Sequence, residues 1–198
     1  MHKNTNLLML LLLTDAVFLC LHFFLQNGLL VYDSFSLTKD AGFAEIIQYL
    51  KEFWIIALLM LMALKKKVLV YFFWSLLFIF ILIDDSISLH ELIGLEFTQY
   101  FDLSSSFGLR GRDSGELIIY AILAITLLPV LASYWFATKE DKLFSIILMV
   151  FLGFLGFFGI FLDILSNVLA HGFLSILEDF GEMVVMSFIF WFVYNRAL

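Results

Sequence analysis

The chain has 198 residues, of which 63% are hydrophobic and 15% are charged, and its formal net charge is -7. Soluble domains contain roughly 45–50% apolar and about 25% charged residues, so the composition excludes an ordinary soluble domain. One proline and 11 glycines exclude a disordered or collagen-like chain, and the negative charge argues against a nucleic-acid partner. The single cysteine, Cys20, excludes an internal disulfide and a thiolate metal cluster.

The first apolar run, at 6–26, begins like a signal peptide. Asp15 interrupts its apolar core, however, and no cleavage site of small residues follows it. We therefore expect this run to be retained as a first membrane span.

Long apolar runs continue through the rest of the chain. A helix needs ~20 mostly apolar residues to cross ~30 Å of hydrocarbon, and unpaired backbone groups are not tolerated there. Six stretches meet this requirement: 6–26, 46–64, 68–88, 115–137, 143–169 and 175–195. The sequence predicts an all-α, polytopic integral membrane helical bundle, with about six transmembrane helices in a single domain.

Two segments between the spans, 27–45 and 92–114, are longer than simple turns and are expected on the outer side. The end of the first leads into a helical pattern that is apolar on one face and polar on the other. The apolar face is Phe43, Ile46, Ile47 and Leu50, and the polar face is Glu45, Gln48, Lys51 and Glu52. This pattern predicts an amphipathic lead-in at the membrane interface, and 92–114 a loop that could fold over the outer face.

Basic residues indicate the orientation of the bundle, because Lys and Arg are enriched in cytoplasmic loops. With the N-terminus inside, seven basic residues fall on inner segments and four on outer ones. The inner set is Lys3, Lys65, Lys66, Lys67, Lys139, Lys142 and Arg196, and the outer set is Lys39, Lys51, Arg110 and Arg112. We predict that both termini are cytoplasmic, and we expect a bacterial inner membrane.

Acidic and histidine side chains lie within or beside five of the six spans. They are Asp15, His22, Asp84, Asp85, His90, Glu91, Glu116, Asp163, His171, Glu178, Asp179 and Glu182. At 1.5 Å per residue, Asp84 lies ~24 Å and Glu182 ~20 Å from the inner edge of the bilayer. Ionisable residues in a membrane normally face the protein interior or a water-filled cavity. We therefore predict one shared cluster in the outer half of the bundle, open to the outside.

Helical phase supports this cluster, because residues four or seven apart share a helix face. Asp15 and His22 align in this way, as do Asp84 with Glu91 and Glu178 with Glu182. For some residues of this predicted cluster, an interpretation without a functional role stays open. Glu91, Glu116 and His171 would fit wetted interfacial residues without function, and Asp85, Asp163 and Asp179 would fit helix caps.

Carboxylates and imidazoles without thiols are typical ligands of Zn, Mn or Fe. A divalent metal ion would also explain how several acids coexist in a low-dielectric site. The most specific part of the predicted metal site is Asp84, Asp85, His90, Glu91, Glu178, Asp179 and Glu182, although neither Glu-x-x-His nor His-Glu-x-x-His occurs. A membrane metalloenzyme would use metal-activated water on a lipid-like substrate, with Arg110 and Arg112 near its phosphate. The sequence carries no nucleotide or haem motif.

Two other classes of function stay open. Intramembrane acids also serve proton- or cation-coupled transporters, in which Pro129 could kink the fourth span and glycines 153, 156 and 159 would permit close helix approach. Against transport, the inner half lacks a matching polar path, and six helices are few unless the protein forms a homo-oligomer. In a non-catalytic membrane subunit or sensor, the acids would hold the bundle together or bind a partner.

Four short runs resemble a group of uncharacterised bacterial multipass membrane proteins. They are DAGFAEIIQYLK at 40–51, DDSISLHE at 84–91, GLRGRDSGE at 108–116 and LEDFGEM at 177–183. The resemblance implies that Asp84, Asp85, His90, Glu91, Glu178, Asp179 and Glu182 act as one unit. In the fifth span that group often has Asp-x-x-His, where this chain has Asp163-Ile-Leu-Ser166. No activity follows from the resemblance.

Overall fold

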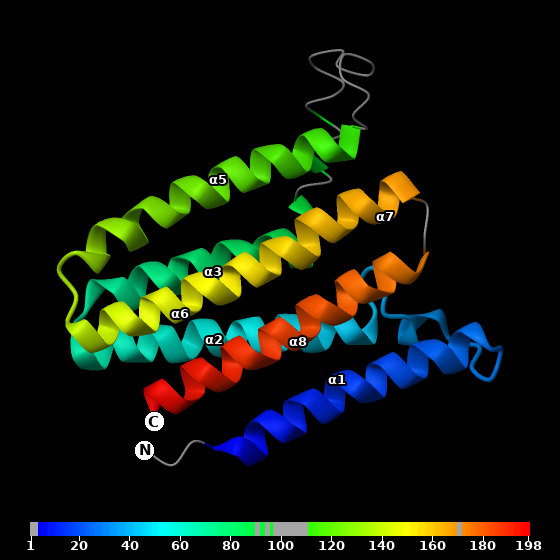
Figure 1. The fold of residues 1–198 in the computed structure, drawn as a ribbon, viewed down its shortest axis with the longest axis horizontal. Helices are drawn as coiled ribbons and strands as arrows, with labels where there is room; N and C mark the ends of the chain where they lie inside the picture. The colour runs from blue at the N-terminus through cyan, green and yellow to red at the C-terminus, as the bar shows by residue number, and fades with distance from the viewer. Residues whose placement is uncertain (1–3, 90–91, 94–95, 97–110, 170–171) are drawn as a thin grey trace.

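The computed structural model describes residues 4–89, 92–93, 96, 111–169 and 172–198, which form a bundle of long helices (Figure 1). The long helices are α1 (Thr5–Gln26), α2 (Phe43–Lys66), α3 (Leu69–Ile87), α5 (Gly111–Tyr134), α6 (Lys139–Gly156) and α8 (Gly172–Ala197). A short 3-10 helix, η1 (Asp33–Phe35), precedes α2. The helix α6 continues without a break through a π-helix, η2 (Phe157–Leu162), into α7 (Asp163–Leu169). The prediction of an all-α chain with about six helices is confirmed.

Two tight turns and both chain ends lie toward the same end of the bundle (Figure 1). The turn after α2 forms because Lys67 adopts the left-handed conformation, with φ 55°, and its N–H donates to the carbonyl of Ala63. The turn before α6 is fixed by Thr138, whose hydroxyl accepts from the N–H of Asp141 at 3.3 Å. Successive helices therefore run up and down between two ends.

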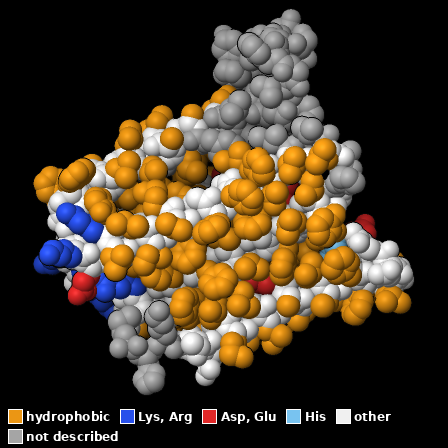
Figure 2. All heavy atoms as spheres, in the orientation of Figure 1, with side chains coloured by type: hydrophobic (Ala, Val, Ile, Leu, Met, Phe, Trp, Pro, Cys, Tyr) orange, Lys and Arg blue, Asp and Glu red, His pale blue; other side chains and the backbone are white. Residues whose placement is uncertain are grey.

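The face of the bundle seen in Figure 2 is largely apolar between its two ends. On α1, for example, Met9 is 69% and Leu13 62% exposed, whereas the two buried residues of that helix are Asp15 and His22. Four helical segments are long and apolar enough to cross a membrane: Thr5–Gln26, Phe43–Lys66, Leu69–Ile87 and Lys139–Leu162. This count refers to the described residues.

The main core joins α2, α3, α6 and α8. It contains Ile55, Leu59, Trp74, Phe78 and Ile189, each with at most 1% of its surface exposed. Between α6 and α8 the rings of Phe144 and Phe192 stack with their centroids 5.0 Å apart. A second, smaller hydrophobic cluster of Leu37, Ala44, Ile176 and Met183 lies toward the other end of the bundle, where polar residues are also buried.

The predicted amphipathic lead-in at 43–52 is not a separate interfacial segment, because α2 runs unbroken from Phe43 to Lys66. Its faces are also oriented differently from a helix on a membrane surface. Gln48, Lys51 and Glu52 are buried in the bundle, while Ile46 and Leu50 are exposed on its outside. The predicted loop at 92–114 lies mostly outside the described residues, and α5 already begins at Gly111.

A polar network closes the end of the bundle that carries the basic residues (Figure 2). The hydroxyl of Tyr71 on α3 donates to Asp141 Oδ1 on α6 at 2.5 Å, and Thr138 donates to Asp141 Oδ2 at 2.7 Å. Arg196 at the end of α8 pairs with Asp141 at 3.1 Å and with Glu140 at 3.2 Å. Three helices are thereby joined at one level.

Replacing Tyr71 with phenylalanine should lower the free energy of unfolding by about 1.5–3 kcal/mol, the usual contribution of a hydrogen bond to a charged group. The ring would keep its packing, and the hydroxyl's bond to Asp141 would be lost together with the longer bonds it accepts from Arg196 at 3.4 Å and Lys66 at 3.5 Å. Thermal unfolding of the purified protein measures the effect. The matched control is Tyr32→Phe, because Tyr32 is 73% exposed. Equal unfolding temperatures for the two variants would show that the Tyr71 bond does not stabilise the bundle.

Candidate functional site

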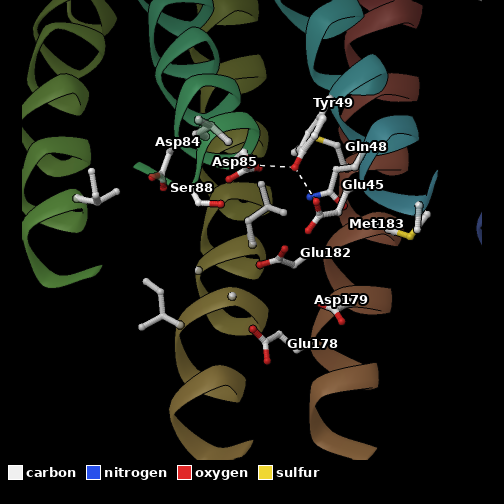
Figure 3. A pocket seen from close by; sticks show the side chains of 18 of the residues that line it. Glu45, Gln48, Tyr49, Asp84, Asp85, Ser88, Glu178, Asp179, Glu182 and Met183 are labelled. Atoms are coloured by element: carbon white, nitrogen blue, oxygen red, sulfur yellow. Dashed lines mark hydrogen bonds between the residues drawn. The ribbon is translucent and has the colours of Figure 1, made fainter. Parts of the chain in front are cut away.

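A cavity of about 280 Å³ lies at the end of the bundle opposite the tight turns, among α2, α3, α5, α8 and the junction of α6 with η2. Seven carboxylate side chains line it, and Figure 3 labels all of them except Asp40: Asp40, Glu45, Asp84, Asp85, Glu178, Asp179 and Glu182. Gln48, Tyr49 and Ser88 add neutral polar groups. No lysine, arginine or histidine is among the described residues of the lining. The described part of the lining is therefore strongly acidic.

Helical spacing places these groups around the cavity. On α8, Glu178 and Glu182 are one turn apart, and on α2 Glu45 and Tyr49 have the same spacing. The Tyr49 hydroxyl lies 2.7 Å from Glu45 Oε2 and 2.9 Å from the carbonyl oxygen of Asp85, so it connects α2 with the end of α3. The polar faces of three helices thus meet at one height.

The π-helix η2 brings the backbone of the fifth helical segment against α8. A Cβ atom added to Gly159 would overlap Glu182 Oε1, and one added to Gly181 would overlap the ring of Phe158. Gly181 therefore permits the close approach of the two helices, and a larger residue at position 159 would displace the Glu182 carboxylate. Single π-helical turns often occur at functional sites, and this one lies directly beside a cavity carboxylate.

Glu52 lies next to the cavity, one turn along α2 from Gln48. It is fully buried, and neither of its carboxylate oxygens has a hydrogen-bond partner among the described residues. The side chains of Asp85 and Gln48 nevertheless lie near its carboxylate, and the charges of Asp85 and Glu182 act on it. A buried carboxylate without a partner is costly, because it loses its hydration and gains nothing in return.

Lys51, the neighbour of Glu52 in the sequence, forms its ion pair with Asp15 and not with Glu52, because its side chain lies on another side of α2. Its Nζ atom lies 2.5 Å from Asp15 Oδ1 and donates to the carbonyl oxygen of Met183 at 3.2 Å. Ser187 donates to the second oxygen of Asp15 at 2.6 Å. This buried ion pair holds α1 against α2 and α8, outside the cavity.

Five residues of the predicted metal site line the cavity together: Asp84, Asp85, Glu178, Asp179 and Glu182. Of the additional predicted members, Asp15, His22 and Asp163 do not line it. Both ring nitrogens of His22 are engaged: Nδ1 accepts from the N–H of Leu37 at 3.1 Å, and Nε2 lies 2.9 Å from the side-chain amide of Gln26. His22 therefore anchors the segment after α1, and Asp163 begins α7.

Other predicted members cannot be placed. His90, Glu91, Arg110 and His171 lie outside the described residues. Arg112 and Glu116 belong to α5, but only their backbone is described. Within the described part of the chain, no three Asp, Glu, His or Cys side chains are grouped closely enough to hold a metal ion.

The structure adds residues to the cavity that sequence reasoning had not assigned to it. They are Asp40, Glu45, Gln48 and Tyr49 in its lining and Glu52 beside it. The signal for most of them was visible, because Glu45, Gln48 and Glu52 recur at helical spacing. It was assigned to the membrane interface, since periodicity shows that a helix has a polar face but not what that face contacts.

An all-α bundle with an acidic cavity at one end is thus the class that the fold and site define. The chain belongs to the family described as domain of unknown function DUF8692, which matches residues 7–198. Comparison with curated proteins and with solved structures found no match.

Proposed function

We propose that the chain is an integral membrane protein whose six long helical segments cross the bilayer. The exposed apolar sides of the bundle and its buried charged residues support this proposal, since a lipid solvent favours that arrangement. Lys65, Lys66 and Lys67 lie in the turn at the end where both termini lie, as expected for a cytoplasmic face. The acidic cavity would then open on the outer side of a bacterial inner membrane.

We infer that this cavity binds a cation. The observation that carries the inference is Glu52, a fully buried carboxylate without a hydrogen-bond partner in the described part of the chain, beside a cavity lined by seven other carboxylates. Carboxylates in a low-dielectric site repel one another and lose hydration, and a bound cation offsets both costs.

The proposed ion is divalent, with Zn, Mn or Fe as candidates, and of these Mn best suits a site of carboxylate oxygens. Asp85 on α3 and Glu182 on α8 would supply ligands from facing helices. Their side chains would have to rotate toward one another, since no group of three acids or histidines is closed in the described residues. A metal ion held there could activate water for hydrolysis of a lipid-like substrate.

Metal titration of the purified protein tests the proposal. We expect Zn²⁺ or Mn²⁺ to bind the unmutated protein stoichiometrically and Glu182→Gln or Glu52→Gln to weaken binding about tenfold, which is the loss of roughly 1.4 kcal/mol. Isothermal titration and elemental analysis measure affinity and stoichiometry. Asp33→Asn is the matched control, because it also removes one negative charge but lies on the exposed helix η1. The proposal fails if neither metal binds the unmutated protein, or if all three variants bind as it does.

A further inference from the structure

The lining of the cavity divides into two levels along the bundle axis. On α3, Phe80 and Ile81 come one turn before Asp84 and Asp85, and on α8 Met186 comes one turn after Glu182. One turn is about 5.4 Å, and α3 and α8 run in opposite directions, so both helices put acids at the outer level and apolar groups at the inner one. Leu123, Leu152 and Leu155 add to the inner lining, while the outer level also contains apolar residues beside the acids, among them Ala44 and Met183.

The size of the cavity also exceeds what a bare ion needs. Its volume is about 280 Å³, whereas a water molecule takes about 30 Å³ in the liquid. Ligand pockets for small molecules begin at roughly 300 Å³ and combine apolar walls with a few polar groups. The cavity has both kinds of lining, and its inner level adjoins the main hydrophobic core.

The carboxylates surround the cavity from α2, α3 and α8 without converging on one point (Figure 3). This arrangement suits a cation with several N–H donors, since each donor can reach a different carboxylate. The acids therefore select a positively charged head, and the inner level offers a place for an aliphatic chain.

We propose that the cavity binds an alkylammonium amphiphile, with its ammonium head among Asp85, Asp179 and Glu182 and its chain against Leu123, Leu155 and Met186. This proposal rests on the proposed function, because it uses the same cation-binding carboxylates. The ligand and a divalent metal ion would compete for them. Glu52 at the edge of the site adds to the negative potential that attracts the head.

A chain-length series on the full-length protein in lipid nanodiscs tests the proposal, with empty nanodiscs subtracted. Radiolabelled butylammonium, decylammonium and decanoate are the probes. Each buried methylene strengthens binding roughly fourfold. Burial of only two of the additional methylenes of decylammonium should therefore make it bind at least about tenfold more tightly than butylammonium. Decanoate should show no saturable binding. Equal affinity of the two amines, or decanoate binding as tightly as decylammonium, would overturn the proposal.

A matched pair of variants on α5 locates the chain. Leu123→Trp fills the inner level, and Leu128→Trp places the same ring at a position that is 59% exposed. We expect the first to weaken decylammonium binding about tenfold and butylammonium binding by less than about twofold, and the second to leave both unchanged. Equal effects of the two variants would place the chain elsewhere and overturn the proposal.

Metal titration of the same samples distinguishes the amphiphile proposal from the proposed binding of a divalent metal ion. If Mn²⁺ binds and decylammonium does not, the amphiphile proposal fails and the proposed function stands. If neither binds, both fail. The chain-length series needs no mutation, so a misfolded Leu123→Trp variant would not prevent the test.

Discussion

Replacing Lys51 with methionine is expected to destabilise the protein by about 3–5 kcal/mol, the cost of leaving one partner of a buried ion pair without the other. Asp15 is fully buried, and Lys51 is only 4% exposed. After the substitution the Asp15 carboxylate would keep its bond to Ser187 but would lose its counter-charge. Thermal unfolding in detergent or nanodiscs, followed by circular dichroism, measures the change.

Two further variants make this result specific. Lys39→Met removes the same positive charge from an exposed position and should leave the unfolding temperature unchanged. Asp15→Asn combined with Lys51→Met removes both charges and should recover much of the lost stability, because replacing a whole buried pair is often close to neutral. If Lys51→Met unfolds like the unmutated protein, the ion pair does not hold α1 in place.

Replacing Gly159 with valine is expected to weaken cation binding about a hundredfold, which corresponds to roughly 2.8 kcal/mol. The new side chain would occupy the space of the Glu182 carboxylate and push it away from the facing acids. It would also overfill the contact between η2 and α8, so a moderate loss of stability of about 1–3 kcal/mol should accompany the effect. Metal titration and thermal unfolding give the two readouts.

The matched control for this effect lies on the same helical segment. Gly153 is exposed, and a Cβ atom added there would meet nothing within 4 Å. Gly153→Val therefore imposes the same β-branched residue on a helix without touching the cavity. Equal affinities of the two variants would mean that the close approach of Gly159 to Glu182 has no role in binding.

The helices themselves could be predicted from the sequence because the hydropathy signal is local. Each of the six apolar stretches falls on a helical segment, and 143–169 coincides with α6, η2 and α7 taken together. The π-helix within that segment could not be foreseen, since Phe157–Leu162 is as apolar as its surroundings. Only the structure shows this π-helix, together with the close packing of Gly159 and Gly181 between η2 and α8.

The candidate site was predictable where acids stood out against an apolar background, as at Asp84, Asp85 and Glu182. On α2 the same reasoning was less informative, because a polar face can turn toward water or toward other helices. The pairing of Lys51 with Asp15 depends on how α1, α2 and α8 pack, over a sequence separation of 36 residues. Residue spacing within one helix contains no information about such a partner.

The polar contacts of α1 also set the order in which the protein can be completed during synthesis. The helix α1 and the residue before it bond to α8, which is made later, through Asp15 to Ser187 and through Asn4 to Asn195 and Trp191. Chains are made from the N-terminus, so a nascent chain that lacks α8 keeps the pair of Asp15 with Lys51 but lacks the bonds to Ser187, Asn195 and Trp191. We expect such a chain to have a loosely held α1, because only the packing of α8 completes these contacts.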